Sequence, residues 1–163
     1  MSDDALPICE KKDTFELSDE LYEVWYDSDF MNSEVTLLFL KTMIELMEKN
    51  WSPQSIAWCL DISRCKVFYC KNSTNQIVSG IVCFYIPSRR TGWILLSFTD
   101  PNYRKKGFNK ILYKYVEKYF KSKGAKFISV IVNKDNSPRL IASQKNGLLI
   151  DYVHLTKRIE NAI

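Results

Sequence analysis

The stretch FTDPNYRKKGFNKIL, residues 98–112, gathers positive charge around one glycine. Four cations flank Gly107: Arg104, Lys105, Lys106 and Lys110. A helix that starts at Phe108 would present unpaired N–H groups and about half a positive charge at its N-terminus. Because glycine has no Cβ, a ligand can come close to the backbone there. These residues predict an anion site, with phosphate or a diphosphate as its natural occupant.

The segments on both sides of this loop predict the elements that hold it. Residues 93–99, WILLSFT, form an almost continuous apolar run, which indicates a buried strand. From Phe108 onward apolar residues recur at helical spacing, up to Gly124: Ile111, Leu112, Tyr115, Val116, Tyr119 and Phe120. Residues 126–133 predict a second buried strand. A strand, a helix and a strand in this order indicate a parallel, right-handed β-α-β crossover.

The remaining elements complete a mixed sheet. Residues 1–14 read as a loose, charged lead-in. The patterns predict strands over residues 20–27, 66–71, 76–86 and 148–159, and helices over 33–50, 52–61 and 137–147. We therefore expect an α/β (α+β) fold whose antiparallel N-terminal half precedes one parallel crossover, in a single domain over residues 1–163.

Composition narrows the class of protein. The chain has 163 residues, of which 46% are hydrophobic, enough to form a core. Its net charge of +4 is small for a nucleic-acid-binding protein, so we expect no nucleic-acid partner. No CxxC pair occurs among the five cysteines and there is one histidine, so we expect no metal site. Neither a signal peptide nor an apolar run of membrane length is present, which favours a cytoplasmic protein without membrane contact.

The loop resembles the acyl-CoA-binding signature of the GNAT superfamily of N-acyltransferases. That signature is Arg or Gln, two residues, Gly, one residue, then Gly or Ala. Arg104 and Gly107 match it, whereas Asn109 stands where the family prefers a small residue. Pro101 and Tyr103 match the usual lead-in.

A second family block is similar to NSPRLIASQKNGL, residues 136–148. Asn136, Lys145 and Gly147 match, while Leu148 stands where phenylalanine is usual. The resemblance covers residues 66–158. It implies a GNAT-like fold in which the strands on either side of the crossover helix splay apart.

The resemblance also implies how acetyl-CoA binds. Its pantetheine arm would lie between the splayed strands, against the backbone of residues 97–99, and its diphosphate would rest on the N–H groups of residues 104–109. Lysines near the loop would meet the ribose phosphate. The implied cofactor-binding residues are Ser97, Phe98, Thr99, Arg104, Lys105, Lys106, Gly107, Phe108, Asn109, Lys110 and Asn136.

In this family an amine attacks the thioester directly, and a side chain protonates the departing thiolate. Relatives often have tyrosine seven residues after the asparagine, where this chain has Ser143. The resemblance thus implies Ser143 as the proton donor, with Tyr152 as a substitute. No ionisable side chain lies in residues 93–99, where many relatives carry a base. A water chain, Glu34 or Asp61 would have to take the amine's proton, and we read His154, the single histidine, as a packing residue.

Three functions stay open on this basis. The first is an N-acetyltransferase that uses acetyl-CoA to acetylate a primary amine of a small molecule or protein, as a monomer or homodimer. The second is a non-catalytic CoA-binding sensor or scaffold of the same fold. The third is a small nucleic-acid-binding protein that would use a basic stripe on the long helix: Lys114, Lys118, Lys121 and Lys123.

Overall fold

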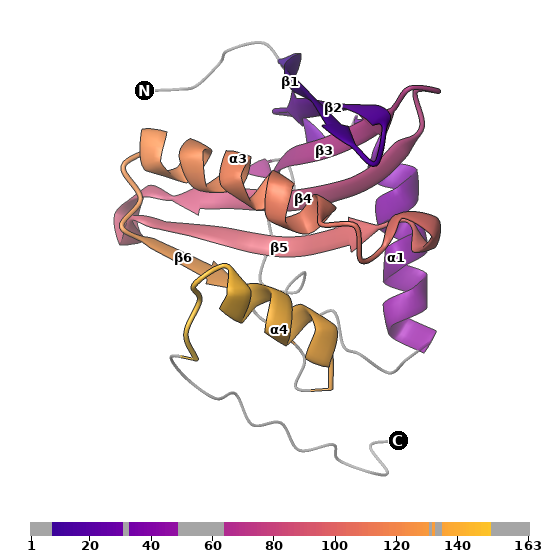
Figure 1. Ribbon diagram of the computed structural model, residues 1–163. Helices are drawn as coiled ribbons and strands as arrows, with labels where there is room; N and C mark the ends of the chain where they lie inside the picture. The colour runs from indigo at the N-terminus through magenta and orange to yellow at the C-terminus, as the bar shows by residue number, and fades with distance from the viewer. Residues whose placement is uncertain (1–7, 31–32, 49–63, 131, 133–134, 151–163) are drawn as a thin grey trace, which may run out of the picture.

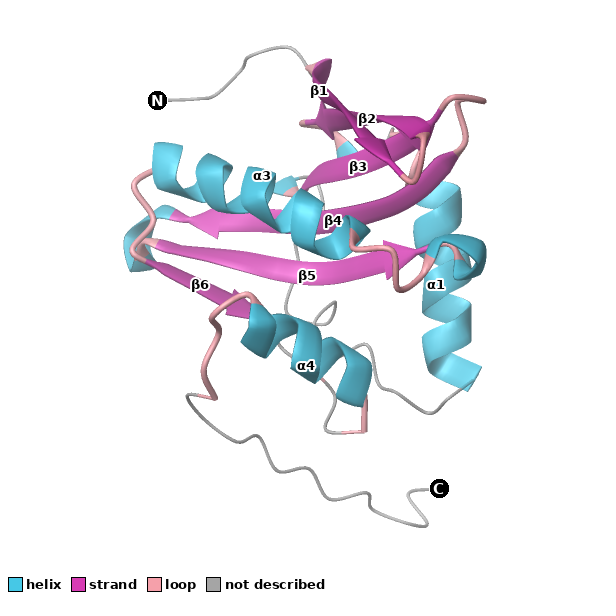
Figure 2. Cartoon of the chain, viewed as in Figure 1, coloured by secondary structure: helices cyan, strands magenta, loops and turns pink. Residues whose placement is uncertain are grey.

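The computed structural model describes residues 8–30, 33–48, 64–130, 132 and 135–150. Within these residues, six strands form one sheet in the order β1 to β6. Each strand from β1 to β4 pairs antiparallel with the next, and β5 pairs parallel with β6. Figures 1 and 2 show the arrangement. The strands are β1 (Cys9–Leu17), β2 (Glu20–Asp27), β3 (Lys66–Asn72), β4 (Ile77–Ile86), β5 (Thr91–Thr99) and β6 (Phe127–Val130).

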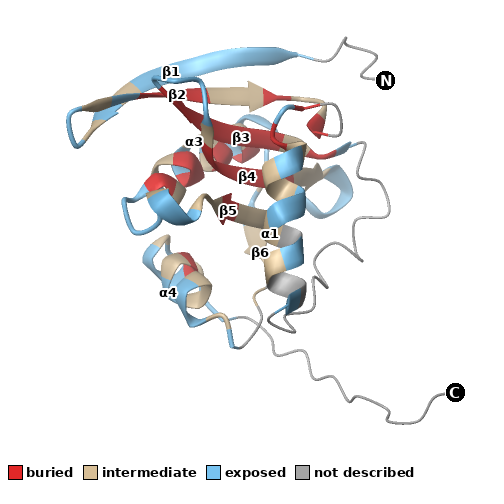
Figure 3. Ribbon diagram, turned by 90° about the vertical axis from the view of Figure 1, so that its right-hand side faces the viewer, coloured by how far each residue is buried: buried red, intermediate tan, exposed pale blue. Residues whose placement is uncertain are grey.

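Helices cover both faces of the sheet. α1 (Thr36–Glu48) and α3 (Phe108–Ser122) lie on opposite faces (Figure 3), and α4 (Ser137–Lys145) follows β6. Short 3-10 turns, η3 (Pro87–Arg89) and η4 (Pro101–Tyr103), flank β5. In the described ranges, no helix is long and apolar enough to cross a membrane.

Successive side chains along a strand point to opposite faces of the sheet, so buried side chains form a core on each face. On β3, Phe68 and Cys70 pack in the cluster that contains the α3 side chains Leu112 and Val116. Val67 and Tyr69 point to the other face and pack in a cluster that α1 covers. The central strands are therefore buried on both sides. This packing holds β5 in place, and with it the start of the loop that follows.

The predicted mixed sheet, the hairpin of β3 and β4 and the β5–α3–β6 crossover are confirmed. The predicted loose lead-in is wrong for residues 9–14, because Cys9–Leu17 pair with β2 along the edge of the sheet, and residues 1–7 lie outside the described residues. β1 is largely exposed, and it is held by this pairing and by Phe15 and Leu17, which pack against the core. Of the predicted strand over 148–159, residues 148–150 are not in a strand, and the others lie outside the described residues, as does the predicted helix 52–61.

Candidate functional site

β5 and β6 separate halfway along β5. Their parallel pairing runs from Thr91–Phe127 to Ile94–Val130 and ends there. On the other side of β5, Val82 pairs with Leu96 and Cys83 with Ile94, so Leu95 is an inserted bulge residue. A bulge bends its strand and increases its twist. From this point to Thr99, β5 stays paired with β4, but its other edge has no described strand beside it, because β6 ends at Val130 (Figure 1).

The loop between β5 and α3 is held by its own polar side chains. The carboxylate of Asp100 accepts a hydrogen bond of 2.9 Å from the amide of Asn102, which starts η4. Asn72 Nδ2 donates to Tyr103 Oη at 2.9 Å and ties the turn to β3. Lys105 and Gly107 both have left-handed backbone conformations, with φ of 63° and 94°. Such left-handed residues turn successive amides toward one side, as in anion-binding nests.

The N-terminus of α3 is rigid but not capped. The ring of Phe108 is 1% exposed and packs against Tyr22, at a centroid distance of 4.9 Å. Gly107, the residue before the helix, makes no side-chain capping hydrogen bond. Within the described residues, the amides of residues 105–109 donate no hydrogen bond, and a Cβ at Gly107 would meet no atom within 4 Å. Several fixed N–H groups are therefore available to an anion.

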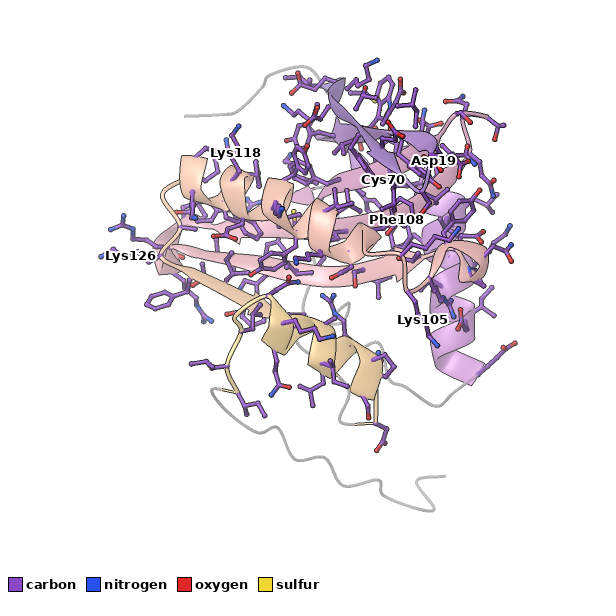
Figure 4. The ribbon with its side chains drawn as sticks, viewed as in Figure 1. Asp19, Cys70, Lys105, Phe108, Lys118 and Lys126 are labelled. Carbon is purple, nitrogen blue, oxygen red and sulfur yellow. The ribbon has the colours of Figure 1, made fainter. Side chains whose placement is uncertain are left out.

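The cations of this loop divide into two kinds. Lys105, Lys106 and Lys110 are exposed, and Figure 4 labels Lys105 and Phe108 at the loop. The guanidinium of Arg104 is instead engaged: it donates to both carboxylate oxygens of Glu45 on α1, and its Nε donates to the carbonyl of Thr99 at 3.1 Å. Arg104 thus joins the loop to α1 and β5, while the lysines are exposed to solvent and Lys106 Nζ lies 4.9 Å from the centre of the Tyr103 ring.

The β5 residues face the opening mainly with their backbone. The ring of Phe98 is 3% exposed and packs in the cluster that α1 covers. Thr99 Oγ1 lies 2.8 Å from Ser79 Oγ on β4, while Ser97 is half-buried and makes no side-chain hydrogen bond within the described part of the chain. Binding at Phe98, as at Phe108, would therefore use main-chain groups and not the ring.

Three buried polar atoms have no hydrogen-bond partner in the described residues, and they lie on three different elements. They are Trp93 Nε1 on β5, Asn109 Oδ1 on α3 and Ser143 Oγ on α4. A buried polar atom without a hydrogen bond costs about 1–3 kcal/mol. The Ser143 hydroxyl could donate to a ligand and the Asn109 amide oxygen could accept from a ligand N–H, which fits the amide groups of the predicted cofactor.

α4 presents two predicted residues and one that sequence reasoning missed. Asn136 caps the helix by accepting a hydrogen bond of 3.3 Å from the amide of Arg139. Ser143 is 5% exposed. Arg139 lies between them on the same helix face and is half-buried, and its guanidinium makes no hydrogen bond or ion pair among the described residues. Arg139 stands three residues after Asn136 and four before Ser143, and this spacing could have indicated from the sequence that it shares their helix face.

Of the other predicted proton-transfer residues, Glu34 is the one that lies in the described part of the chain. Glu34 forms an ion pair with Lys71 and accepts a hydrogen bond of 3.1 Å from Tyr69 Oη, so its carboxylate is engaged on β3. Tyr152, His154 and Asp61 lie outside the described residues. In the part of the chain that the structure describes, no cluster of side chains is arranged to hold a metal ion.

Comparison with known proteins agrees with this geometry. A model of the acetyltransferase (GNAT) family matches residues 16–145. No protein of curated function matches the sequence.

Solved structures share the fold. An aminoglycoside acetyltransferase from an uncultured soil metagenomic sample is 16% identical, with a TM-score of 0.58 over 85% of this chain and 97% of that one. A putative acetyl transferase from Pyrococcus furiosus is 20% identical, with a TM-score of 0.54 over 58% of this chain and 66% of that one. AAC(6')-Iy, solved with a CoA bisubstrate analog, is 14% identical, with a TM-score of 0.51 over 60% of this chain and 70% of that one.

Proposed function

The chain belongs to the GNAT family of acetyltransferases, and we propose that it transfers an acetyl group from acetyl-CoA to a primary amine of a small molecule or protein. The observation that carries the proposal is the set of unpaired amides over residues 105–109. They follow β5, whose parallel pairing with β6 ends at Ile94. Fixed N–H groups next to an open strand edge suit a ligand with phosphates at one end and amide groups along its length.

Different residues of the site would bind different parts of acetyl-CoA. The amides of residues 105–109 would hold the diphosphate, and the exposed side chains of Lys105, Lys106 and Lys110 would add Coulombic attraction. The backbone of Ser97, Phe98 and Thr99 would bond the pantetheine arm, and Asn136 would contact it from α4. Because the loop is tied to α1 and β3, these groups are positioned before the ligand arrives.

When bound, acetyl-CoA supplies a thioester carbonyl that the lone pair of a neutral amine can attack, forming the C–N bond as the C–S bond breaks. Ser143 Oγ is buried and unpartnered, and would donate a hydrogen bond to the sulfur as negative charge develops on it. β5 carries no ionisable side chain, so the amine's proton would leave through water.

Two observations keep a non-catalytic role as the second candidate. β5 lacks a base, and Ser143 is a weaker proton donor than a tyrosine phenol. A protein that binds CoA through the same loop without turning it over would act as a sensor or scaffold.

The test is transfer of isotope-labelled acetyl groups from acetyl-CoA to a panel of amines, alongside calorimetry with CoA alone. Solved neighbours include an aminoglycoside acetyltransferase in complex with sisomicin, so aminoglycosides enter the panel beside polyamines, amino acids and peptides. Transfer supports the proposal. Binding without transfer to any amine favours the sensor, and absence of CoA binding removes both.

We also propose that the protein works in a reducing compartment, the cytoplasm. Cys9, Cys65, Cys70 and Cys83 are all free thiols, although two of them lie on neighbouring strands. Oxidising compartments favour disulfides. Fractionation of cells that express the tagged protein tests this.

A further inference from the structure

Arg139 is a cation partly withdrawn from water without a counter-charge. It lies in the first turn of α4 and is half-buried, and its guanidinium makes no hydrogen bond or ion pair with the described residues. Burial lowers the pKa of its guanidinium to about 10, an effect that the nearby phenol of Tyr113 partly opposes. The group therefore stays charged at neutral pH. A desolvated charge of this kind is costly unless an anion pairs with it.

Two polar side chains on α3 and α4, Asn109 and Ser143, also have a buried atom without a hydrogen-bond partner. Ser143 lies one turn further along α4, on the same face. On α3, Tyr113 lies one turn after Asn109 and is 8% exposed. We call these four residues, Asn109, Tyr113, Arg139 and Ser143, the α3–α4 seam. Both Asn109 Oδ1 and Ser143 Oγ are buried without a hydrogen bond, so the seam holds unsatisfied polar groups from both helices.

The seam is continuous with the anion loop. Asn109 is the second residue of α3 and directly follows the free amides of residues 105–108. α3 and α4 both begin at the side of the molecule where β5 ends (Figure 1). Leu148, just after α4, packs against the core cluster that contains Tyr113. The first turn of α4 thus adds one cation, Arg139, which interacts with Tyr113, one turn after Asn109.

We infer that Arg139 binds a phosphate group of acyl-CoA from the α4 side, opposite the amides of the loop. This inference rests on the proposed function, because it assumes that acyl-CoA occupies the site. The chemistry is a charge-assisted hydrogen bond between guanidinium and phosphate, which is strong in a partly dry setting. The exposed lysines of the loop would attract the ligand, whereas Arg139 would hold it.

Calorimetry with four proteins and three ligands tests the contact. The proteins are the wild type, Arg139→Ala, Arg139→Lys and Lys123→Ala, a control that removes an exposed charge from the far end of α3. The ligands are CoA, 3′-dephospho-CoA and pantetheine. We expect Arg139→Ala to bind CoA about tenfold more weakly than the wild type, as for the loss of a charge-assisted hydrogen bond. Arg139→Lys should retain part of the affinity, and Lys123→Ala nearly all of it.

Pantetheine, which has no phosphate, separates this contact from a structural effect. Arg139→Ala should bind it as the wild type does. A loss that persists with 3′-dephospho-CoA assigns the contact to the diphosphate, and a loss confined to CoA assigns it to the 3′-phosphate; both support the inference. Equal CoA affinity of wild type and Arg139→Ala overturns it, as does an equal loss for pantetheine. A wild type that binds no CoA instead removes the proposed function.

Discussion

The guanidinium of Arg104 donates two hydrogen bonds to the carboxylate of Glu45, at 3.2 and 2.8 Å. These residues are 59 positions apart in the chain, and their ion pair joins the loop after β5 to α1. The two side chains are 42% and 33% exposed, so solvent screens the pair and its stability contribution is only about 0–1 kcal/mol. Its main effect is to fix the loop.

A comparison of Arg104→Ala with Glu45→Ala tests this role. Both variants lose the ion pair, and each should melt within a few degrees of the wild type. Arg104→Ala also loses the bond from Nε to the carbonyl of Thr99, so we expect it to weaken CoA binding more than Glu45→Ala. Calorimetry with CoA measures the difference. Equal affinities in the two variants would show that the link to α1 is the only contribution of Arg104.

Two substitutions of Gly107 can separate the effect of backbone strain on stability from the effect of a blocked anion site on CoA binding. Its φ of 94° is unfavourable for any other residue by about 1–2 kcal/mol, although a Cβ would meet no atom within 4 Å. Gly107→Ala and Gly107→Glu should therefore lose similar stability in thermal unfolding. Only the glutamate places bulk and negative charge at the free amides, so it should abolish CoA binding while alanine only weakens it. CoA affinity that is the same in both variants would falsify the loop assignment.

Gly80 on β4 is needed because the ring of Phe98 lies over it. A Cβ at Gly80 would approach Phe98 Cζ to 2.4 Å. We expect Gly80→Ala to destabilise the protein by about 1–3 kcal/mol, as overpacked cores do. In a double-mutant cycle, Phe98→Leu should relieve part of this cost, giving a favourable coupling free energy in urea unfolding. If the two changes simply add, the ring does not press on this glycine.

The elements of the fold that can be predicted from the sequence are those with a clear local pattern of apolar and polar residues. α3 begins at Phe108 as expected, because apolar residues repeat at helical spacing and Gly107 marks the start. β1 carries a weaker pattern: the first six residues of its sequence, CEKKDTFEL, are polar apart from Cys9, and Phe15 and Leu17 alone supply apolar side chains to the core, while β2 supplies its hydrogen bonds. Charged edge strands of this kind protect a sheet from further pairing, and they look like loops in a sequence.

The same contrast applies to the site. Gly107 and its cations were predictable, since the chemistry of an anion loop lies in consecutive residues. The engagement of Arg104 by Glu45 was not, because that contact joins distant parts of the chain. The half-buried state of Arg139 likewise depends on how α4 packs near Tyr113. The bulge at Leu95 follows from strand register, which an apolar run such as WILLSFT does not specify.

Thiol reactivity provides a test of the core. Cys65, Cys70 and Cys83 are buried, and burial raises the pKa of Cys70 to about 12 and that of Cys83 further. A raised pKa leaves little thiolate at pH 8, and the thiolate is the reactive form. In a Cys59→Ser background, we therefore expect iodoacetamide to modify only the exposed Cys9 in the native protein, and the three others after denaturation. A Cys9→Ser variant should lose the native reaction, and rapid labelling of a second thiol would contradict the packing of β3 and β4.

Ser143→Ala tests the proposed proton donor. Because Ser143 Oγ has no hydrogen bond in the structure, its removal should leave thermal stability and CoA affinity nearly unchanged. If the hydroxyl stabilises the developing thiolate, kcat should fall by roughly tenfold or more, with little change in KM for acetyl-CoA. Ser137→Ala, at the exposed start of the same helix, is the matched control and should retain full activity. An unchanged kcat in Ser143→Ala would take this serine out of the mechanism and leave the sulfur to be protonated by water or by a residue outside the described part of the chain.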